Sequence, residues 1–255
     1  MAQRRRLALL LLPLLALPLG ACTTIGFTGT GKLDEDGLET SSELKLTPGG
    51  NVKGTLAAFS KLAADTGGLH FSSARSDDVP MTIKKIIYTG IPERRPLDLV
   101  FVVDTTGSMA NDIAAVRTQL RSIQDVLAAR NPDHRIGLVA YRDRGDVYLS
   151  QTVLALSAEE GPVRAAINSL EVGGGGDFPE HVYAGLATAL TDQPWRPNAT
   201  QHIVLLGDAP PHDDYQDDPK NRAWVLRAAK SGGRSVTIHA ITLSCGRLCR
   251  TELGL

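Results

Sequence analysis

A five-residue loop, Asp104-Thr105-Thr106-Gly107-Ser108, carries side chains that suit a hard metal ion. Magnesium prefers oxygen ligands in an octahedral arrangement and keeps several of its waters. The aspartate, the second threonine and the serine alternate along the loop, so their oxygens can turn toward one point. The glycine between them lets the loop bend tightly. The loop therefore predicts a site in which one carboxylate and two hydroxyls, from Asp104, Thr106 and Ser108, surround a divalent cation.

Two further loops offer carboxylates to the same ion. A glycine run, residues 173–176, comes directly before Asp177, and Gly207 comes directly before Asp208. The glycines let the second loop approach closely and aim its aspartate. Taken singly, each loop also has a structural explanation, because aspartate and serine often cap helices and a glycine run is often only a turn. The order of the three loops and their positions relative to the expected elements favour one shared site that includes Asp177 and Asp208.

Strands that alternate with helices must position these loops. Residues 97–103 form an apolar, β-branched run, which is typical of a strand buried on both faces. Hydrophobic periodicity and turn residues predict further strands over 136–141, 148–156, 202–206 and 236–243, and helices over 109–130, 159–170, 179–190 and 222–230. Such alternation predicts a mostly parallel sheet covered by helices on both sides. Ligands of such sheets bind at the carboxyl ends of the strands.

The pattern Asp-x-Thr-x-Ser after an apolar strand resembles the metal-ion-dependent adhesion site of von Willebrand factor A-type (vWA) domains. The resemblance implies an α/β, doubly wound, Rossmann-like fold. It also implies that Ser108 and Thr106 coordinate the ion directly, and that Asp104 and Asp208 act directly or through water. The expected cofactor is Mg²⁺, or Mn²⁺ or Ca²⁺ in its place.

The second loop departs from the usual vWA pattern, because Asp177 stands where the family usually has a threonine. The variant Gly-Gly-Gly-Asp-x-Pro-Glu is similar to a bacterial and extracellular vWA subgroup, as are Tyr141-Arg142-Asp143 and Asp208-Ala209-Pro210-Pro211. A carboxylate in place of the threonine is expected to make the ion less electrophilic or to shift the preference toward calcium. This departure puts the family's usual mechanism, in which the ion keeps an open position for a partner, partly in doubt.

The resemblance over residues 97–255 leaves the family's fold incomplete, because the last helix, strand and helix are missing after the final expected strand. Residues before the core offer similar pieces: a helical pattern, a short strand-like run and a second helical pattern, over 55–64, 69–71 and 77–87. Segment 55–96 is therefore expected to complete a circularly permuted vWA domain, since domain termini often lie close together. The alternatives are a short unrelated subdomain and the remnant of a preceding repeat.

Residues 1–21 are typical of a bacterial lipoprotein signal peptide. Three arginines precede the apolar run 7–19, which is shorter than the roughly 20 residues that span a bilayer. The following Leu19-Gly20-Ala21-Cys22 resembles a lipobox, in which Cys22 is acylated; the alternative is an ordinary cleaved signal. Residues 22–54 are expected to form a flexible tether. The expected location is the bacterial cell envelope, lipid-anchored at the outer membrane or cell surface.

The two remaining cysteines, Cys245 and Cys249, are four residues apart, which permits a disulfide on a turn or adjacent thiols on one helix face. An exported protein meets an oxidising compartment in which a disulfide persists. The 255 residues are 42% hydrophobic and 22% charged, with a formal net charge of −1. These values fit a soluble globular domain, and the absence of a basic patch argues against a nucleic-acid partner.

The leading functional expectation is a binding module and not an enzyme, with a protein partner that supplies an acidic or other oxygen ligand to the ion. The alternative is an aspartyl phosphotransferase of the haloacid-dehalogenase type, whose nucleophile loop the residues around Asp104 resemble. Enzymes of that class usually have a second aspartate where Thr106 stands, and they need a lysine, which is absent between Lys85 and Lys220. A third possibility is a vWA scaffold with an inactive, empty site.

Overall fold

The computed structural model describes residues 45–48, 50–73, 78–176, 178–213, 217–246 and 250, all within one compact unit, Glu39–Leu255. Its elements are α1 (Lys53–Thr66), β1 (His70–Ser72), α2 (Val79–Gly90), β2 (Leu97–Asp104), η2 (Gly107–Asn111), α3 (Ile113–Arg130), β3 (His134–Tyr141), β4 (Ser150–Ser157), α4 (Glu160–Asn168), α5 (Val182–Asp192), β5 (Thr200–Gly207), α6 (Arg222–Ala229) and β6 (Val236–Thr242). The predicted doubly wound α/β fold is confirmed. None of the helices in the described part of the chain is both long and apolar enough to cross a membrane.

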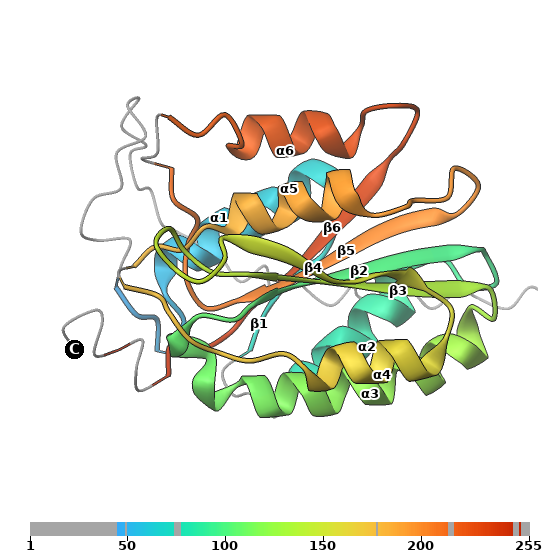
Figure 1. Cartoon of the computed structure of the whole chain (residues 1–255), viewed down its shortest axis with the longest axis horizontal. Helices are drawn as coiled ribbons and strands as arrows, with labels where there is room; N and C mark the ends of the chain where they lie inside the picture. The colour runs from blue at the N-terminus through green and yellow to red at the C-terminus, as the bar shows by residue number, and fades with distance from the viewer. Residues whose placement is uncertain are drawn as a thin grey trace, which may run out of the picture. The chain divides into compact units, whose positions relative to one another are not determined.

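The described strands form one sheet in the order β1-β6-β5-β2-β3-β4 (Figure 1). All neighbouring strands are parallel except β3 and β4, which pair antiparallel. From β2 the chain continues to β3 on one side, whereas β5 continues to β6 on the other side. The boundary between β2 and β5 is therefore a topological switch point, the place where ligands bind in such sheets.

Helices cover the sheet on both faces, with α1, α5 and α6 on one face and α2, α3 and α4 on the other (Figure 1). Every residue of β2 is buried, as expected for a central strand covered on both sides. Alternate residues of β2 enter two separate cores: Phe101 packs in the cluster that includes α2 and α3, and Val102 packs in the cluster that includes α1 and α5. This alternation lets one strand bury side chains in both cores and so holds the sheet between the two helix layers.

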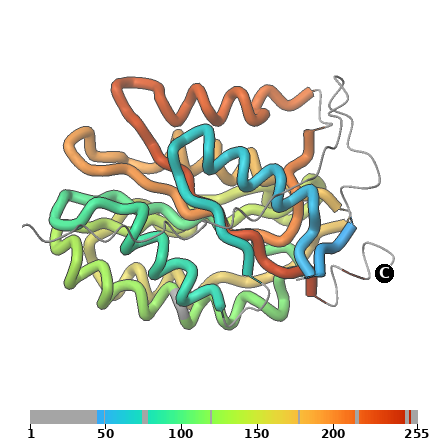
Figure 2. The backbone as a smooth tube through the Cα atoms, turned by 180° about the vertical axis from the view of Figure 1, so that it is seen from behind, coloured from blue at the N-terminus to red at the C-terminus, as the bar shows by residue number. Residues whose placement is uncertain are grey.

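Segment 55–96 contributes directly to this sheet. β1 pairs in parallel with β6, with Phe71 opposite Ile241, and α1 and β1 run beside β6 in Figure 2. The helices α1 and α2 bury apolar residues in the two different cores, among them Phe59 of α1 and Ile83 of α2. The sheet therefore receives its outermost strand on the β6 side from residues that precede the core in sequence. Circular permutation as the origin of this arrangement stays a prediction.

The boundary expected for the flexible tether, residue 54, differs from the structure. Val52 is fully buried and pairs with Leu46, and α1 already begins at Lys53. The side-chain amide of Asn51 donates to the carbonyl oxygens of Ser73 and Thr242, at 3.1 and 3.3 Å. The segment around Asn51 is held by hydrogen bonds of the backbone and of one side-chain amide. Such contacts produce no hydrophobic periodicity in the sequence, so they could not be predicted from it.

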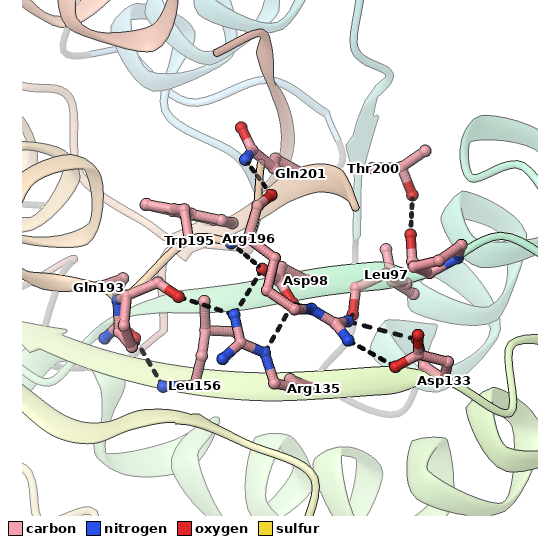
Figure 3. Close-up of polar contacts among 12 residues, drawn as sticks. Leu97, Asp98, Asp133, Arg135, Leu156, Gln193, Trp195, Arg196, Thr200 and Gln201 are labelled. Atoms are coloured by element: carbon pink, nitrogen blue, oxygen red, sulfur yellow. Dashed lines mark hydrogen bonds and ion pairs between the residues drawn. The ribbon is translucent and has the colours of Figure 1, made fainter. Parts of the chain in front are cut away.

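A buried carboxylate joins three segments at the end of the sheet opposite the polar loops (Figure 3). Asp98 of β2 is fully buried and accepts hydrogen bonds from Nε and Nη2 of Arg135 at 2.9 and 2.7 Å. It also accepts from the backbone N–H and Nε of Arg196, at 2.7 and 3.0 Å. Two guanidinium groups thus compensate the burial of one carboxylate, and they fix the loop before β5 to β2 and β3.

Two buried histidines form a hydrogen-bonded pair on neighbouring strands. The backbone N–H of Leu69 donates to Nδ1 of His239 at 3.0 Å, and Nε2 of His239 lies 3.1 Å from Nδ1 of His202. Because Nδ1 of His239 accepts a hydrogen bond, the ring proton lies on Nε2, which is the donor in the neutral pair. Burial lowers the pKa of His202 from 6.5 to about 4, and burial together with His202 lowers the pKa of His239 to about 3. The folded protein therefore keeps both rings neutral.

This pair is expected to make the domain sensitive to acid. Above pH 6.5 both rings are neutral in the folded and unfolded chains. As the pH falls from 6.5 toward 4, the unfolded chain binds protons that the folded chain does not. The free energy of unfolding should therefore fall by up to about 1.4 kcal/mol per pH unit for each histidine. Urea unfolding between pH 7.5 and 4.5, with chelator present, measures this slope.

The control for this prediction is the double substitution His202→Gln and His239→Gln. It is expected to lower the stability at neutral pH but to flatten the loss of stability toward pH 4.5, because glutamine does not titrate. An unchanged slope in the double variant would show that other groups dominate the acid response.

Candidate metal centre

The first polar loop begins at the last residue of β2 and places three oxygen-bearing side chains together. Oδ1 of Asp104 accepts hydrogen bonds from the backbone N–H of Thr106 at 2.9 Å and from its hydroxyl at 2.7 Å. The hydroxyl oxygens of Thr106 and Ser108 lie 3.2 Å apart. Asp104, Thr106 and Ser108 are all buried. The loop continues into the 3-10 helix η2, which holds Ser108, so the α-helix predicted from residue 109 begins only at Ile113.

The third loop begins at the end of β5, next to the first. The hydroxyl of Ser108 donates to Oδ1 of Asp208 at 3.0 Å. Oδ2 of Asp208 is buried and has no hydrogen-bond partner among the described residues. Burial and then the charge of Asp104 raise the pKa of Asp208 well above its usual range, while the hydrogen bond from Ser108 opposes this shift. The structure therefore brings two carboxylates together in a buried place that disfavours their negative charge.

The donor set fits a divalent cation. When each hydroxyl donates to its carboxylate, Thr106 to Asp104 and Ser108 to Asp208, no proton remains for the 3.2 Å contact between the two hydroxyl oxygens. Their lone pairs and the bare Oδ2 of Asp208 are the kind of oxygen ligands that magnesium takes. A positive ion would also compensate the buried negative charge. The geometry of these four side chains is therefore consistent with the predicted site.

The second loop contacts the first through its backbone. The N–H of Gly107 donates to the carbonyl oxygen of Gly174, and the N–H of Gly173 donates to the carbonyl oxygen of Thr105, both at 3.0 Å. Asp177 lies outside the described residues, so its place in the site stays a prediction. The helix expected from residue 179 begins only at Val182.

Two further buried residues, Glu180 and Tyr141, lie near the site outside the predicted set of ligands. Glu180 is fully buried, and its backbone pairs with Pro211 in the third loop. Tyr141 ends β3 and is fully buried; burial raises the pKa of its hydroxyl, followed by the charges of Asp104, Glu180 and Asp208. Three buried carboxylates therefore lie around this hydroxyl. The motifs Tyr141-Arg142-Asp143 and Asp-x-Pro-Glu are the sequence signals that could have identified both residues.

Glycine is required on two sides of the Tyr141 side chain. A Cβ added at Gly207 would lie 2.4 Å from the tyrosine hydroxyl oxygen, and one added at Gly185 would lie 2.8 Å from the ring. The tyrosine thus fills the space beneath the loops between β5 and α5.

No group of three or more His, Cys, Asp or Glu side chains is arranged to hold a metal ion within the part of the chain that the structure describes. This finding does not conflict with the predicted donor set, because two of its donors are hydroxyls and Asp177 is not described.

The cysteines lie away from the three loops in the sequence. Cys245 is buried, packs near Val52 and is disulfide-bonded. Cys22 and Cys249 both lie outside the described residues. The pairing of Cys245 with Cys249 and the acylation of Cys22 therefore stay predictions.

Comparison with known proteins identifies the family. A family model described as von Willebrand factor A domain matches residues 98–240. Alpha-protein kinase vwkA of Dictyostelium discoideum is 27% identical over 140 residues, which are 54% of this chain and 21% of that protein. The putative ariadne-like RING finger protein R811 of Acanthamoeba polyphaga mimivirus is 31% identical over 116 residues, 46% of this chain and 11% of that protein.

The chain spans only about a fifth or less of the length of these two curated relatives. Among solved structures, the SpRpn10 VWA domain is similar at 15% identity and a TM-score of 0.39, over 62% of this chain and 93% of that chain. The family model matches more than half of the 255 residues, and the matched range includes all three polar loops. The chain therefore belongs to the von Willebrand factor A domain family.

Proposed function

We propose that this chain is a binding module, not an enzyme, that recognises a protein partner through a divalent metal ion. The ion is held by Asp104, Thr106, Ser108 and Asp208, with Asp177 from the second loop. The observation that carries this proposal is the buried pair of hydroxyls, each hydrogen-bonded to its own carboxylate and 3.2 Å from the other, beside a carboxylate oxygen of Asp208 without a partner among the described residues. A buried carboxylate oxygen without a partner is unfavourable unless a cation or donor satisfies it.

The residues of the site have distinct tasks in this proposal. Asp104 and Asp208 accept the hydroxyl protons of Thr106 and Ser108, which turns the hydroxyl lone pairs toward the ion. When bound, the ion supplies a Lewis-acidic point to which an oxygen of the partner can bind. Asp177 adds negative charge and tunes the preference among Mg²⁺, Mn²⁺ and Ca²⁺.

The place of action follows from the sequence of the first 54 residues. Acylation of Cys22 would anchor the chain in a membrane, since each buried methylene of an acyl chain contributes about 0.8 kcal/mol. We propose a lipid-anchored protein of the bacterial cell envelope, at the outer membrane or cell surface. The two curated relatives carry different names, a kinase and a RING finger protein, and share only part of their length with this chain. That pattern supports a domain used as a module.

Two adjacent threonines allow a sharp test of the metal site. Thr106 faces the carboxylates, whereas the hydroxyl of Thr105, equally buried, donates to the carbonyl oxygen of Tyr141 at 2.9 Å. Thr106→Val and Asp104→Ala are expected to weaken metal binding beyond the roughly 10–100-fold loss that removing an outer-shell partner causes. Thr105→Val should bind the ion as the wild type does. Isothermal titration with Mg²⁺, Mn²⁺ and Ca²⁺ measures these affinities.

The same variants serve in a crosslinked pull-down with and without chelator. A partner captured by the wild type and by Thr105→Val, but lost with chelator or with Asp104→Ala, is the expected result. Absence of metal binding by the wild type, or undiminished binding by Asp104→Ala, would contradict the proposed function.

A further inference from the structure

The glycine loop of the metal centre is held from outside by a residue that the metal site does not use. Oδ2 of Asp146, in the loop after β3, accepts a hydrogen bond from the backbone N–H of Gly175 at 2.9 Å. On the other side, the carbonyl oxygen of Gly174 accepts from the N–H of Gly107, in the first metal loop, at 3.0 Å. The glycine loop is thus fixed between the side chain of Asp146 and the backbone of the first loop.

The contact with Asp146 is close enough to explain why glycine stands here. A Cβ added at Gly174 would lie 2.0 Å from Oδ1 of Asp146, and the φ of this glycine is +75°. Gly175 also has a positive φ, of +73°, and its added Cβ would lie 3.0 Å from Oε1 of Glu180 and 3.1 Å from Cβ of Thr106. Both the backbone conformation and the space on either side therefore require glycine. The glycine loop is therefore packed closely between Asp146 on one side and Thr106 on the other.

Asp146 is itself fixed to the end of β3. Its Oδ2 accepts a second hydrogen bond from the backbone N–H of Asp143 at 3.1 Å, and its own N–H lies 3.3 Å from the carbonyl oxygen of Asp143. One carboxylate oxygen therefore joins the turn after β3 to the glycine loop. Hydrogen bonds to an ionised acceptor are roughly twice as strong as those between neutral groups. The side chain is only partly buried, so this charge costs little desolvation.

We propose that Asp146 is a positioning residue for the metal centre: it holds the amide of Gly175 so that the glycine loop stays packed against Thr106 and Gly107. This inference rests on the proposed metal site. Asp146 does not bind the ion; it limits the conformations of the loop that packs against the first metal loop. Its removal lowers the metal affinity because this packing then has to be ordered when the ion binds.

The test compares three variants. Asp146→Ala removes the acceptor, Asp146→Asn keeps a neutral acceptor of the same size, and Ser157→Ala removes a hydrogen bond from the backbone N–H of Glu159 to a serine hydroxyl oxygen at the opposite end of the sheet. Isothermal titration with Mn²⁺ and Mg²⁺ measures affinity, and urea unfolding in chelator measures the stability of the metal-free protein. We expect about 10–100-fold weaker binding for Asp146→Ala, partial recovery for Asp146→Asn and no change for Ser157→Ala.

The outcomes separate this inference from the proposed function. If the wild type binds no ion, both are overturned. If the wild type binds and the folded Asp146→Ala variant binds equally well, only the role of Asp146 is overturned, and any loss of stability in chelator is then purely structural. If Asp146→Ala does not fold, the comparison between Asp146→Asn and the wild type decides: equal affinity contradicts the inference, and reduced affinity supports it.

Discussion

Replacing Asp98 by alanine is expected to lower the free energy of unfolding by about 3–5 kcal/mol, the cost of removing one partner from a buried ion pair. The carboxylate is fully buried, whereas the side chains of Arg135 and Arg196 are 20% and 24% exposed. Without Asp98, two guanidinium groups each lose one of their acceptors, and the backbone N–H of Arg196 loses its hydrogen bond as well. Urea unfolding of the variant and the wild type at pH 7 measures the difference.

Asp133 provides the matched control, because it pairs with the same arginine. Its carboxylate contacts Nη1 of Arg196 but is 61% exposed. Exposed ion pairs contribute about 0–1 kcal/mol, so Asp133→Ala should lower the stability by less than about 1 kcal/mol. Similar losses in the two variants would show that the burial of Asp98 does not set the strength of this network. A loss confined to Asp98→Ala would assign the effect to the buried carboxylate.

The central strands could be predicted from the sequence because burial on both faces leaves a continuous apolar signal. Residues 97–103 were predicted as such a strand, and β2 is buried along its whole length. Asp98, the polar residue within segment 97–103, does not interrupt this apolar pattern, although its side chain is fully buried. The partners that make its burial possible, Arg135 and Arg196, lie 37 and 98 residues further along the chain. Pairing over such separations leaves no local signal.

The convergence of Asp104 and Asp208 could be predicted because both residues sit directly at strand ends. Asp104 ends β2 and Asp208 follows β5, and these two strands are neighbours in the sheet. That the two carboxylates hold a metal ion stays a prediction. Asp146 could not be found in this way, because its role depends on the three-dimensional path of the glycine loop. Tyr141 belongs to a motif that resembles a vWA subgroup, but the motif alone does not say what its hydroxyl lies beside. Only the structure shows that its hydroxyl lies among carboxylates.

The junction between α1 and β1 is where the N-terminal segment meets the rest of the sheet. The hydroxyl of Thr66 accepts from the backbone N–H of Ile238 at 3.0 Å. Gly67 then ends α1 with a φ of +73°, and Gly68 passes directly against the backbone of β6. If residues 55–96 are part of the domain, as their pairing with β6 requires, a defect at this junction should affect the stability of the whole domain. A loosely attached segment would tolerate it.

Gly68→Ala is therefore expected to lower the free energy of unfolding by about 3 kcal/mol, at the upper end of the usual cost of overpacking. Its added Cβ would lie 1.9 Å from the carbonyl oxygen and 2.6 Å from the carbonyl carbon of Ile238. These atoms belong to the backbone of a strand paired on both sides, so they cannot move without disturbing the pairing of β6 with β1 or β5. Urea unfolding followed by circular dichroism measures the loss.

Gly67→Ala is the neighbouring control. A Cβ at Gly67 meets nothing within 4 Å, so its cost is the left-handed backbone alone, about 1–2 kcal/mol. The difference between the two variants isolates the contact between Gly68 and β6, because both add the same methyl group to the same turn. A single cooperative transition in both variants, with the larger loss at Gly68, is the result expected when α1 and β1 fold together with the core. Equal losses, or a separate early transition in Gly68→Ala, would instead mark residues 55–96 as an independent segment.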